Sequence, residues 1–400
     1  MINKAIILKY MEAKTSLKNV NFSINQLILG LISLSLFCSS CQSSETISQH
    51  MNVSPQNESL EDKIYFNDFS GIVYCLNVKD GKENWKINFE DGFDGSLTID
   101  KENGYLGRDK LGFISFNLKD RKIQWKNILN DGSLSTPFVS QDNLFLGIKS
   151  QYLTNVNKKT GQTIWQFEDP NFGNFHYIGG YEKNTIYAST DLTFLYTLFS
   201  FNSMTGKVNW SAQTESEIIA NPAFYSDLVI TIDFIGNVTA YNKETGRVVW
   251  NYLSDYNTNP TNIEIIDDEV FVVSETGTLY CLNVKTGFEK WKLNLGKGLS
   301  SSICSSGNLI FFNTSNGELI AYDVKLRKNK WVLSTGGIKA IPTFYNNTMF
   351  FGNNSGEFQA IDFNAGTKIW SYKCQEKIWS SPSILTKDGK IYRGFGDIKP

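Results

Sequence analysis

Few residues of this chain have the side chains that catalysis or metal binding needs. Its two histidines, His50 and His176, are too few for a multi-histidine metal site and leave a histidine-based triad almost no material. The acidic run 267–269 precedes a strand-like segment, so we expect a solvated turn there in preference to a calcium site. Phosphate-binding glycine loops, GxSxG and HExxH are absent. The sequence therefore predicts no catalytic, cofactor-binding or metal-binding residue. We expect four cysteines to be small buried residues: Cys75, Cys281, Cys304 and Cys374.

The composition is that of a globular, strand-rich protein. The 400 residues include 28 Phe, 18 Tyr, 9 Trp and 31 Gly, but only 8 Pro. Lys and Arg (38) nearly balance Asp and Glu (40), so the chain has no net field to attract nucleic acid or an anionic membrane. We therefore expect no nucleic-acid partner.

The N-terminal region has the features of an export signal. Residues 27–37 form an uncharged apolar run preceded by lysines, too short for the roughly 20 residues of a membrane-spanning helix. The small residues Ser39 and Ser40 before Cys41 resemble the lipobox of bacterial lipoproteins, whose cysteine thiol receives diacylglycerol. Cys38 is a poorer acceptor because bulky Phe37 precedes it.

The resemblance implies that Cys41 is lipidated and becomes the first residue of the mature protein. We predict a lipoprotein signal peptide over residues 1–40 and a flexible, polar tether over 41–62. A plain secretion signal and a membrane anchor are the alternatives. With a lipoprotein signal or with a plain secretion signal, the protein would leave the cytoplasm.

Eight of the nine tryptophans recur every 39–45 residues: Trp85, Trp125, Trp165, Trp210, Trp250, Trp291, Trp331 and Trp370. Eight residues before each lies an Asn or Asp: Asn77, Asn117, Asn157, Asn202, Asn242, Asn283, Asp323 and Asp362. Six copies of the repeat have a glycine four residues before the tryptophan: Gly81, Gly161, Gly206, Gly246, Gly287 and Gly366. Arg121 and Arg327 replace this glycine in the second and seventh copies. The chain is therefore built from eight repeats.

Each repeat predicts a β-hairpin. In Gly277–Trp291 (GTLYCLNVKTGFEKW) an alternating strand reaches the Asn, whose side chain can cap a turn that Thr-Gly completes before the next strand. Two short strands precede each hairpin, the first often with proline. Four strands in roughly 40 residues is the period of a β-propeller blade, and the β-branched alternation excludes a helical solenoid.

We therefore predict an all-β, eight-bladed propeller. Blades stack face to face, so the repeated tryptophans are expected to be structural, within the core between blades; stacking on a ligand is the alternative. The count of expected strands gives one strand more than eight four-stranded blades need, at the point where the ring closes. We predict that residues 378–385 form the inner strand of the N-terminal blade, beside 64–66, and that the tail after Lys390 is accessory.

The pattern Ala/Cys-x-Asn/Asp-x-x-Thr-Gly-x-x-x-Trp resembles the pyrroloquinoline-quinone-type propeller repeat, over residues 63–400. Families with this repeat include quinoprotein dehydrogenases, the outer-membrane assembly factor BamB and extracellular sensor domains. A quinoprotein dehydrogenase would carry a quinone and calcium in its tunnel, a catalytic Asp and adjacent cysteines. This chain has no adjacent cysteines and room for only one small insertion, at 168–181, so we expect no cofactor and no enzyme activity.

The resemblance and the lipobox together predict a non-catalytic, lipid-anchored scaffold for protein–protein interaction at the bacterial cell envelope. Its expected partner is the β-barrel assembly machine or its clients, as for BamB, and its only contact with the membrane is the lipid. The segment 168–181 is either a partner-binding loop or a slightly longer loop on the rim. Two functional alternatives remain: a degenerate quinoprotein that binds a quinone or carbohydrate in the tunnel, and a surface sensor or adhesion module.

Overall fold

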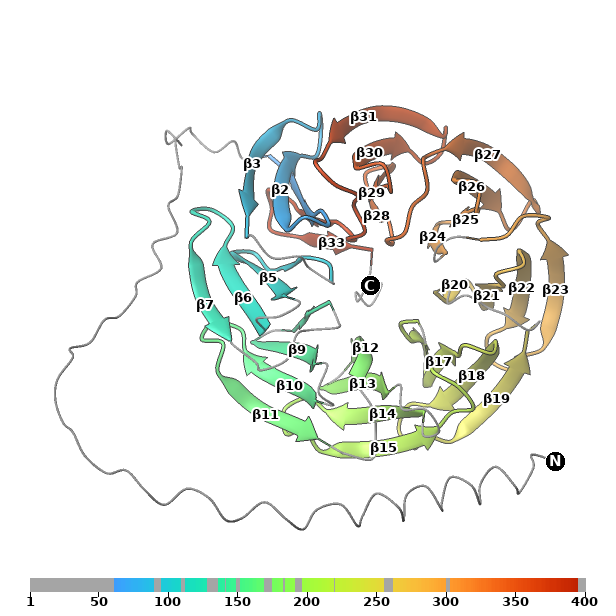
Figure 1. The fold of residues 1–400 in the computed structure, drawn as a ribbon. Coiled ribbons are helices and arrows are strands. Elements are labelled where there is room, and N and C mark those ends of the chain that lie inside the picture. Colours follow the sequence, from blue (N-terminus) through green and yellow to red (C-terminus); the bar gives the residue numbers. More distant parts are fainter. Residues whose placement is uncertain are drawn as a thin grey trace, which may run out of the picture. The chain divides into compact units, whose positions relative to one another are not determined.

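A computed structural model describes residues 61–394 (Figure 1), except for 90–94, 109–111, 128–135, 141, 149–151, 169–174, 183, 191–195, 219, 255–261 and 300–302, and except for the side chains of 108, 148 and 176–182. The chain divides into two units, Met1–Glu58 and Ser59–Pro400, and all described residues belong to the second. The predicted signal peptide, almost all of the tether, and Cys41 lie outside the described residues.

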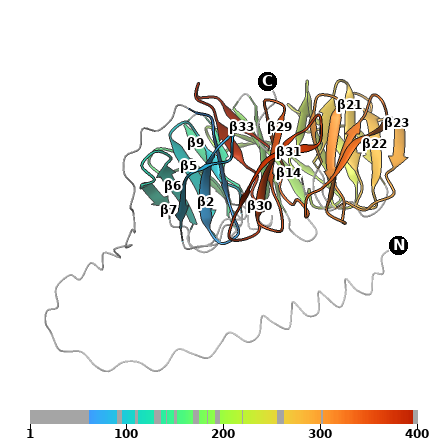
Figure 2. The same cartoon turned by 90° about the horizontal axis from the view of Figure 1, so that it is seen from above.

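The described residues form eight antiparallel sheets around a ring, so the predicted all-β, eight-bladed propeller is confirmed (Figure 1). Seen edge-on, the ring is a disc in which the sheets stand side by side (Figure 2). Blades are numbered here from the N-terminus, with strands given from the axis outward. Blade 1 contains β32 (Ser383–Leu385), β1 (Lys63–Asn67), β2 (Ile72–Asn77) and β3 (Glu83–Asn88). Blade 2 contains β4 (Thr98–Ile99), β5 (Asn103–Arg108), β6 (Gly112–Asn117) and β7 (Ile123–Asn127).

Six further blades complete the ring. Blade 3 contains β8 (Phe138–Val139), β9 (Asn143–Ile148), β10 (Tyr152–Asn157) and β11 (Thr163–Glu168), and blade 4 contains β12 (Phe175–Glu182), β13 (Thr185–Thr190), β14 (Thr197–Asn202) and β15 (Val208–Gln213). Blade 5 contains β16 (Ala223–Tyr225), β17 (Leu228–Ile232), β18 (Asn237–Asn242) and β19 (Val248–Leu253), and blade 6 contains β20 (Glu264–Ile266), β21 (Glu269–Val273), β22 (Thr278–Asn283) and β23 (Glu289–Asn294). Blade 7 contains β24 (Cys304–Ser306), β25 (Leu309–Asn313), β26 (Glu318–Asp323) and β27 (Lys328–Ser334), and blade 8 contains β28 (Thr343–Tyr345), β29 (Thr348–Gly352), β30 (Glu357–Asp362) and β31 (Thr367–Lys373).

The repeated Asn or Asp caps the outer hairpin turn in every blade. Its side-chain oxygen accepts a hydrogen bond from the backbone N–H two residues later, at 2.8–3.2 Å, as Asn283 does from Lys285. The turn glycine has a positive φ near 70°, and Arg121 and Arg327 adopt the same backbone conformation at 63° and 52°. The turn therefore keeps one geometry even where a side chain strains it.

The ring closes as predicted, through pairing of the chain ends. Strand β32 pairs antiparallel with β1, with Ile384 opposite Ile64, and becomes the inner strand of blade 1. The tail adds a fifth strand, β33 (Ile391–Arg393), to the inner edge of β32. Ser380 strengthens the joint, because its hydroxyl donates to the Asn67 carbonyl and accepts from the Asn67 N–H.

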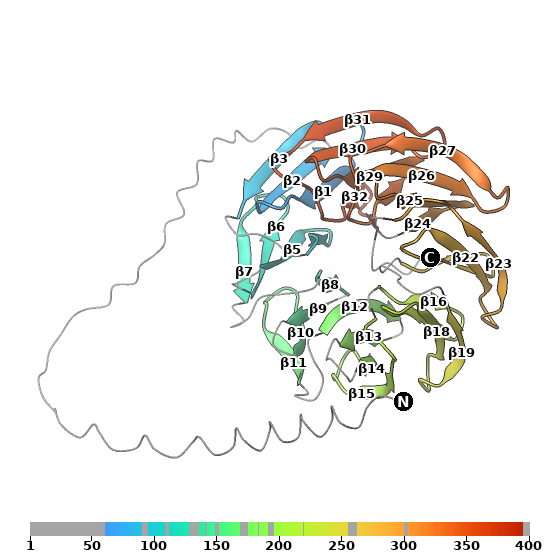
Figure 3. The same cartoon turned by 45° about the vertical axis from the view of Figure 1, so that its right-hand side comes forward.

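The insertion around 168–181 does not form only a loop. Its second half belongs to β12, an eight-residue strand in the position where the other blades have inner strands of two or three residues (Figure 3). The pairing of β12 with β13 shifts register twice, between Phe175 and Tyr177 and between Gly179 and Tyr181. Two of the extra residues are thus absorbed as bulges within the sheet, so a rim loop was the wrong interpretation for 175–181.

Apolar clusters fill the spaces between neighbouring blades. One of them joins Ile230, Val238 and Trp250 of blade 5 to Val270 and Tyr280 of blade 6. The four cysteines of the ring are buried, as expected, and burial raises the pKa of Cys281 and of Cys374 to about 12. No helix in the described part of the chain has the length and apolar character needed to cross a membrane.

Candidate functional site

The repeated tryptophans link each blade to the next. In six joints the indole Nε1 donates to a backbone carbonyl in the next blade's outer turn: Trp125 to Lys158, Trp165 to Ser203, Trp210 to Lys243, Trp250 to Val284, Trp331 to Phe363 and Trp370 to Val78, at 2.8–3.1 Å. The ring of each lies against the turn glycine of that blade: Gly161, Gly206, Gly246, Gly287, Gly366 and Gly81 respectively. A Cβ on any of these glycines would come within 2.7 Å of the indole. This position has no room for a ligand.

The two arginine-bearing turns make different joints. Where Arg327 replaces glycine, its guanidinium lies 4.8 Å from the centre of the Trp291 ring, in a cation–π contact. Where Arg121 replaces glycine, the indole N–H of Trp85 is buried and has no hydrogen-bond partner among the described residues. The joint between blades 1 and 2 therefore lacks a bond that six other joints have.

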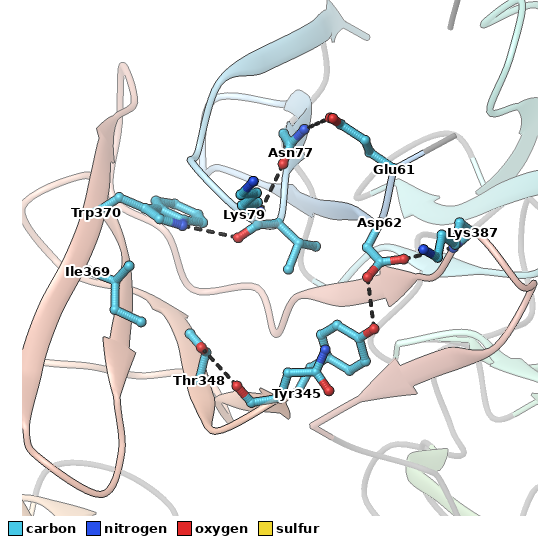
Figure 4. Close-up of a pocket in the computed structure, with 11 residues that line it drawn as sticks. Glu61, Asp62, Asn77, Lys79, Tyr345, Thr348, Ile369, Trp370 and Lys387 are labelled. Carbon is cyan, nitrogen blue, oxygen red and sulfur yellow. Dashed lines mark hydrogen bonds between the residues drawn. The ribbon is translucent and has the colours of Figure 1, made fainter. Parts of the chain in front are cut away.

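A cavity of about 420 Å³ lies where blades 1 and 8 meet (Figure 4). Asp62, just before β1, accepts hydrogen bonds at 2.8 Å from the Tyr345 hydroxyl of blade 8 and from the Lys387 N–H of the C-terminal hairpin. Burial, and then this bond to the Asp62 carboxylate, raise the pKa of Tyr345 to about 12. Asn77 donates to Glu61 at the opposite side of the cavity. The bonds to Asp62 join blade 8 and the C-terminal hairpin to the start of blade 1, whereas the bond of Asn77 to Glu61 lies within blade 1.

A second cavity, of about 650 Å³, lies between blades 2 and 3 beside β33. Asp100 lies in its wall, where burial opposes ionisation but is outweighed by the N–H groups of Glu102 and Asn103, the Tyr105 hydroxyl and the Lys158 ammonium, so the pKa of Asp100 is lowered. The carboxylate is thus fully engaged. No group of three or more His, Cys, Asp or Glu side chains is placed to hold a metal ion anywhere in the described ranges.

The axial side of blade 1 is occupied by the chain's own C-terminal strand (Figure 1). Tyr392 of β33 packs on Tyr345 of blade 8 at 4.8 Å between ring centres, while Arg393 donates to the Ile99 carbonyl of blade 2. Strand β33 therefore ties blades 8, 1 and 2 together next to the axis.

The outer rim is uneven in charge. Five of the eight outer strands expose lysines: Lys86 on β3, Lys126 on β7, Lys290 and Lys292 on β23, Lys328 and Lys330 on β27, and Lys368 and Lys373 on β31. The adjacent outer strands β15 (VNWSAQ) and β19 (VVWNYL) contain no charged residue. Strand β19 also exposes Val248, Val249 and Leu253, by 58%, 50% and 53%. We call β15 and β19 the uncharged edges.

Comparison with known families identifies the repeat. The model of the family described as outer membrane protein assembly factor BamB matches residues 69–173, 149–263 and 263–381. The chain belongs to this BamB family. The propeller of BamB from Moraxella catarrhalis superposes on 82% of this chain and 95% of its own length, with a TM-score of 0.62 and 18% identity, which shows a shared fold.

The curated relatives carry different names. A BamB from Moranella endobia is 26% identical over 180 residues, 38% of this chain and 46% of the relative. A tetrathionate hydrolase from Acidithiobacillus ferrooxidans is 23% identical over 270 residues, 56% of this chain and 54% of the relative. The chain spans about half the length of the curated relatives it matches. Members of this repeat group thus include an assembly factor and an enzyme.

The structure brings together features that sequence reasoning missed. The cavity at the closure joins Asp62 to Tyr345 across 283 positions of the chain, and no local pattern signals that contact. The uncharged edges, in contrast, were readable from the residues around each repeated tryptophan. Comparing these residues between the eight copies, and not only aligning what the copies share, would have found them.

Proposed function

We propose that this BamB-family propeller is a non-catalytic scaffold that binds other proteins at the bacterial cell envelope, in the assembly of outer-membrane β-barrels. The observation that carries the proposal is the rim: valine and leucine side chains are half-exposed on β19, at the outside of a rigid ring. The family supports a protein-binding role, and the carboxylates in both cavities already serve structural contacts.

The direct test is crosslinking in intact envelopes, followed by purification of the tagged protein and identification of what is attached. The proposal expects subunits of a β-barrel assembly machine, or outer-membrane barrel proteins in transit. If saturating crosslinking attaches neither class, the scaffold function is wrong.

We further propose that a lipid on Cys41 holds the propeller at the membrane, because the ending Ser39-Ser40-Cys41 fits a lipoprotein signal. Cys41→Ala should move the protein from the membrane fraction to the soluble fraction and abolish labelling with a fatty-acid analogue. Cys38→Ala is the matched control and should keep both the label and the membrane location. A labelled, membrane-bound Cys41→Ala protein would contradict the assignment.

An enzyme is the second candidate, because a tetrathionate hydrolase is among the relatives. Nothing among the described residues supports a quinone and calcium site in the tunnel: no three His, Cys, Asp or Glu side chains come together there, and β33 lies at the axial edge of blade 1. Pyrroloquinoline quinone with Ca²⁺ should therefore leave the melting temperature unchanged, as measured by differential scanning fluorimetry. Saturable stabilisation by several degrees, with dye reduction on alcohols or sugars, or hydrolysis of tetrathionate, would favour the enzyme.

A further inference from the structure

The outer strands of the ring are open sheet edges. Each is hydrogen-bonded to one neighbour, as β19 is to β18, and within the described residues no strand lies on its other side. An edge strand presents a row of backbone N–H and C=O groups that an extended chain can pair with. Natural proteins commonly protect such edges with lysines, because a strand added there would bury the ammonium groups.

Lysines are present on five edges. Of the other three, β11 carries the acidic Glu168, and the adjacent β15 and β19 carry no charged residue. Strands β27 and β31 each expose two lysines, whereas β15 and β19 expose none and carry no acidic residue either. All eight edges are the same strand of one repeat. The lysines on five of them therefore show that the fold accepts a lysine on this strand. The difference singles out a short arc of the rim, in blades 4 and 5.

Strand β19 is the more apolar of the uncharged edges. Val248, Asn251 and Leu253 pair with Tyr241, Thr239 and Asn237, alternate residues of β18, and therefore lie on one face of β19. Val249 is the extra residue of a bulge between Val248 and Trp250, and all four are exposed. The opposite face holds Trp250, which is buried against blade 6. The exposed face thus offers the apolar side chains of Val248 and Leu253 on either side of Asn251, and an added strand would present every second side chain to this face.

A blade of this ring already accepts a fifth strand. In blade 1, β33 pairs with the inner edge of β32 over three residues and carries Tyr392 onto Tyr345. The four-stranded sheet therefore extends without rearranging the ring. Blade 1 is extended at the axis by the chain's own tail, whereas the outer edge of blade 5 is accessible to other chains.

We propose that the outer edge of β19 binds an extended, uncharged segment of a partner protein, with alternating apolar residues, as a fifth strand of blade 5. The inference rests on the scaffold function and names the surface and the class of partner segment. Backbone hydrogen bonds would supply the pairing, and the exposed Val248, Val249 and Leu253 would favour apolar side chains on the added strand. The absence of charge on β19 favours uncharged segments, because nothing there would compensate a buried charge.

The test uses the full mature ring and a fluorescent nine-residue peptide of alternating valine and threonine, capped at both ends. We expect saturable binding by fluorescence anisotropy. The double substitution V249K/L253K should weaken it by about tenfold or more, the effect of about 1.4 kcal/mol. V249T/L253T keeps the edge uncharged and should lose less. The matched control is V332K on β27, an exposed position beside existing lysines, which should leave binding unchanged.

A second probe isolates the backbone. The same peptide N-methylated at every other residue, prepared in both registers, should not bind in at least one register, because methylation removes the donors that pair with the edge. Equal binding of both methylated peptides, equal loss in V332K, or no binding by the wild type would overturn the proposal. So would a β19-dependent dimer in sedimentation experiments that excludes the peptide, since a second copy would then be the occupant.

These experiments distinguish a failure of the β19 proposal from a failure of the proposed scaffold function. If V249K/L253K melts like the wild type and keeps every envelope crosslink, the scaffold stands and the β19 proposal fails. If the wild type gains no envelope crosslink but binds the peptide through β19, the edge is real and the scaffold function fails.

Discussion

Trp250→Ala is expected to lower the free energy of unfolding by about 3–5 kcal/mol, the usual range for removing a large buried aromatic side chain. Trp250 is only 7% exposed and packs among the apolar residues that join blades 5 and 6. The substitution also removes the donor to the Val284 carbonyl, at 2.9 Å, and leaves Gly287 beside an empty space. Urea denaturation followed by fluorescence measures the loss.

Trp379→Ala is the matched control, because Trp379 lies outside the repeat. Its side chain is 43% exposed and contacts Phe69, Lys377 and Asn354 on the surface near the closure. We expect a loss of about 1 kcal/mol or less. Equal, small losses at both positions would refute the structural role that we assign to the repeated tryptophans.

Deletion of residues 376–400 is expected to have the larger effect, giving an aggregating protein. It removes β32 and β33, leaves β1 as an unpaired edge and takes away Ile378 and Ile384, both fully buried against blades 1 and 8. Each of these side chains contributes about 1.5–3 kcal/mol of burial, and the open ring exposes two apolar blade faces. Size-exclusion chromatography and light scattering would detect the aggregates.

A shorter deletion, of residues 391–400, tests the closure more finely. It removes β33 but keeps the β32 pairing with β1 and the contact of Lys387 with Asp62. This variant should remain monomeric, with a lower melting temperature because Tyr392 no longer packs on Tyr345. If the 376–400 deletion were soluble and as stable as the full ring, the chain ends would not be what closes it.

The sequence predicts the fold well because the repeat encodes it in every copy. Eight tryptophans at one period, each preceded by a turn-capping Asn or Asp, allow one architecture, and counting strands was enough to predict that 378–385 completes the N-terminal blade. The insertion was misjudged for a physical reason. Extra residues usually signal a loop, but β12 takes two of them into its pairing with β13 as bulges, which periodicity does not reveal.

The candidate site is less predictable, since function in a repeat protein resides where the copies differ. The contact of Asp62 with Tyr345 joins residues from opposite ends of the chain, so no spacing rule finds it. The edge of β19 is local, but its meaning depends on knowing that the strand after each turn is outermost. The predicted blade order already implies that position, whereas the exposure of the β19 side chains comes from the folded ring.

The unsatisfied indole of Trp85 leaves the outer part of the joint between blades 1 and 2 with one hydrogen bond fewer than the joint at Trp370. The joint between blades 8 and 1 is closed by strand pairing, by the Trp370 bond to Val78 and by the bonds to Asp62, although the two ends of the chain meet there. The joint between blades 1 and 2 is covalently continuous but lacks the indole bond. Amide hydrogens in β3 and in the turn at Arg121 should therefore exchange with solvent sooner than their counterparts around Trp370. The looser outer contact in this propeller would then lie between two blades that the chain links directly, and not where its two ends meet.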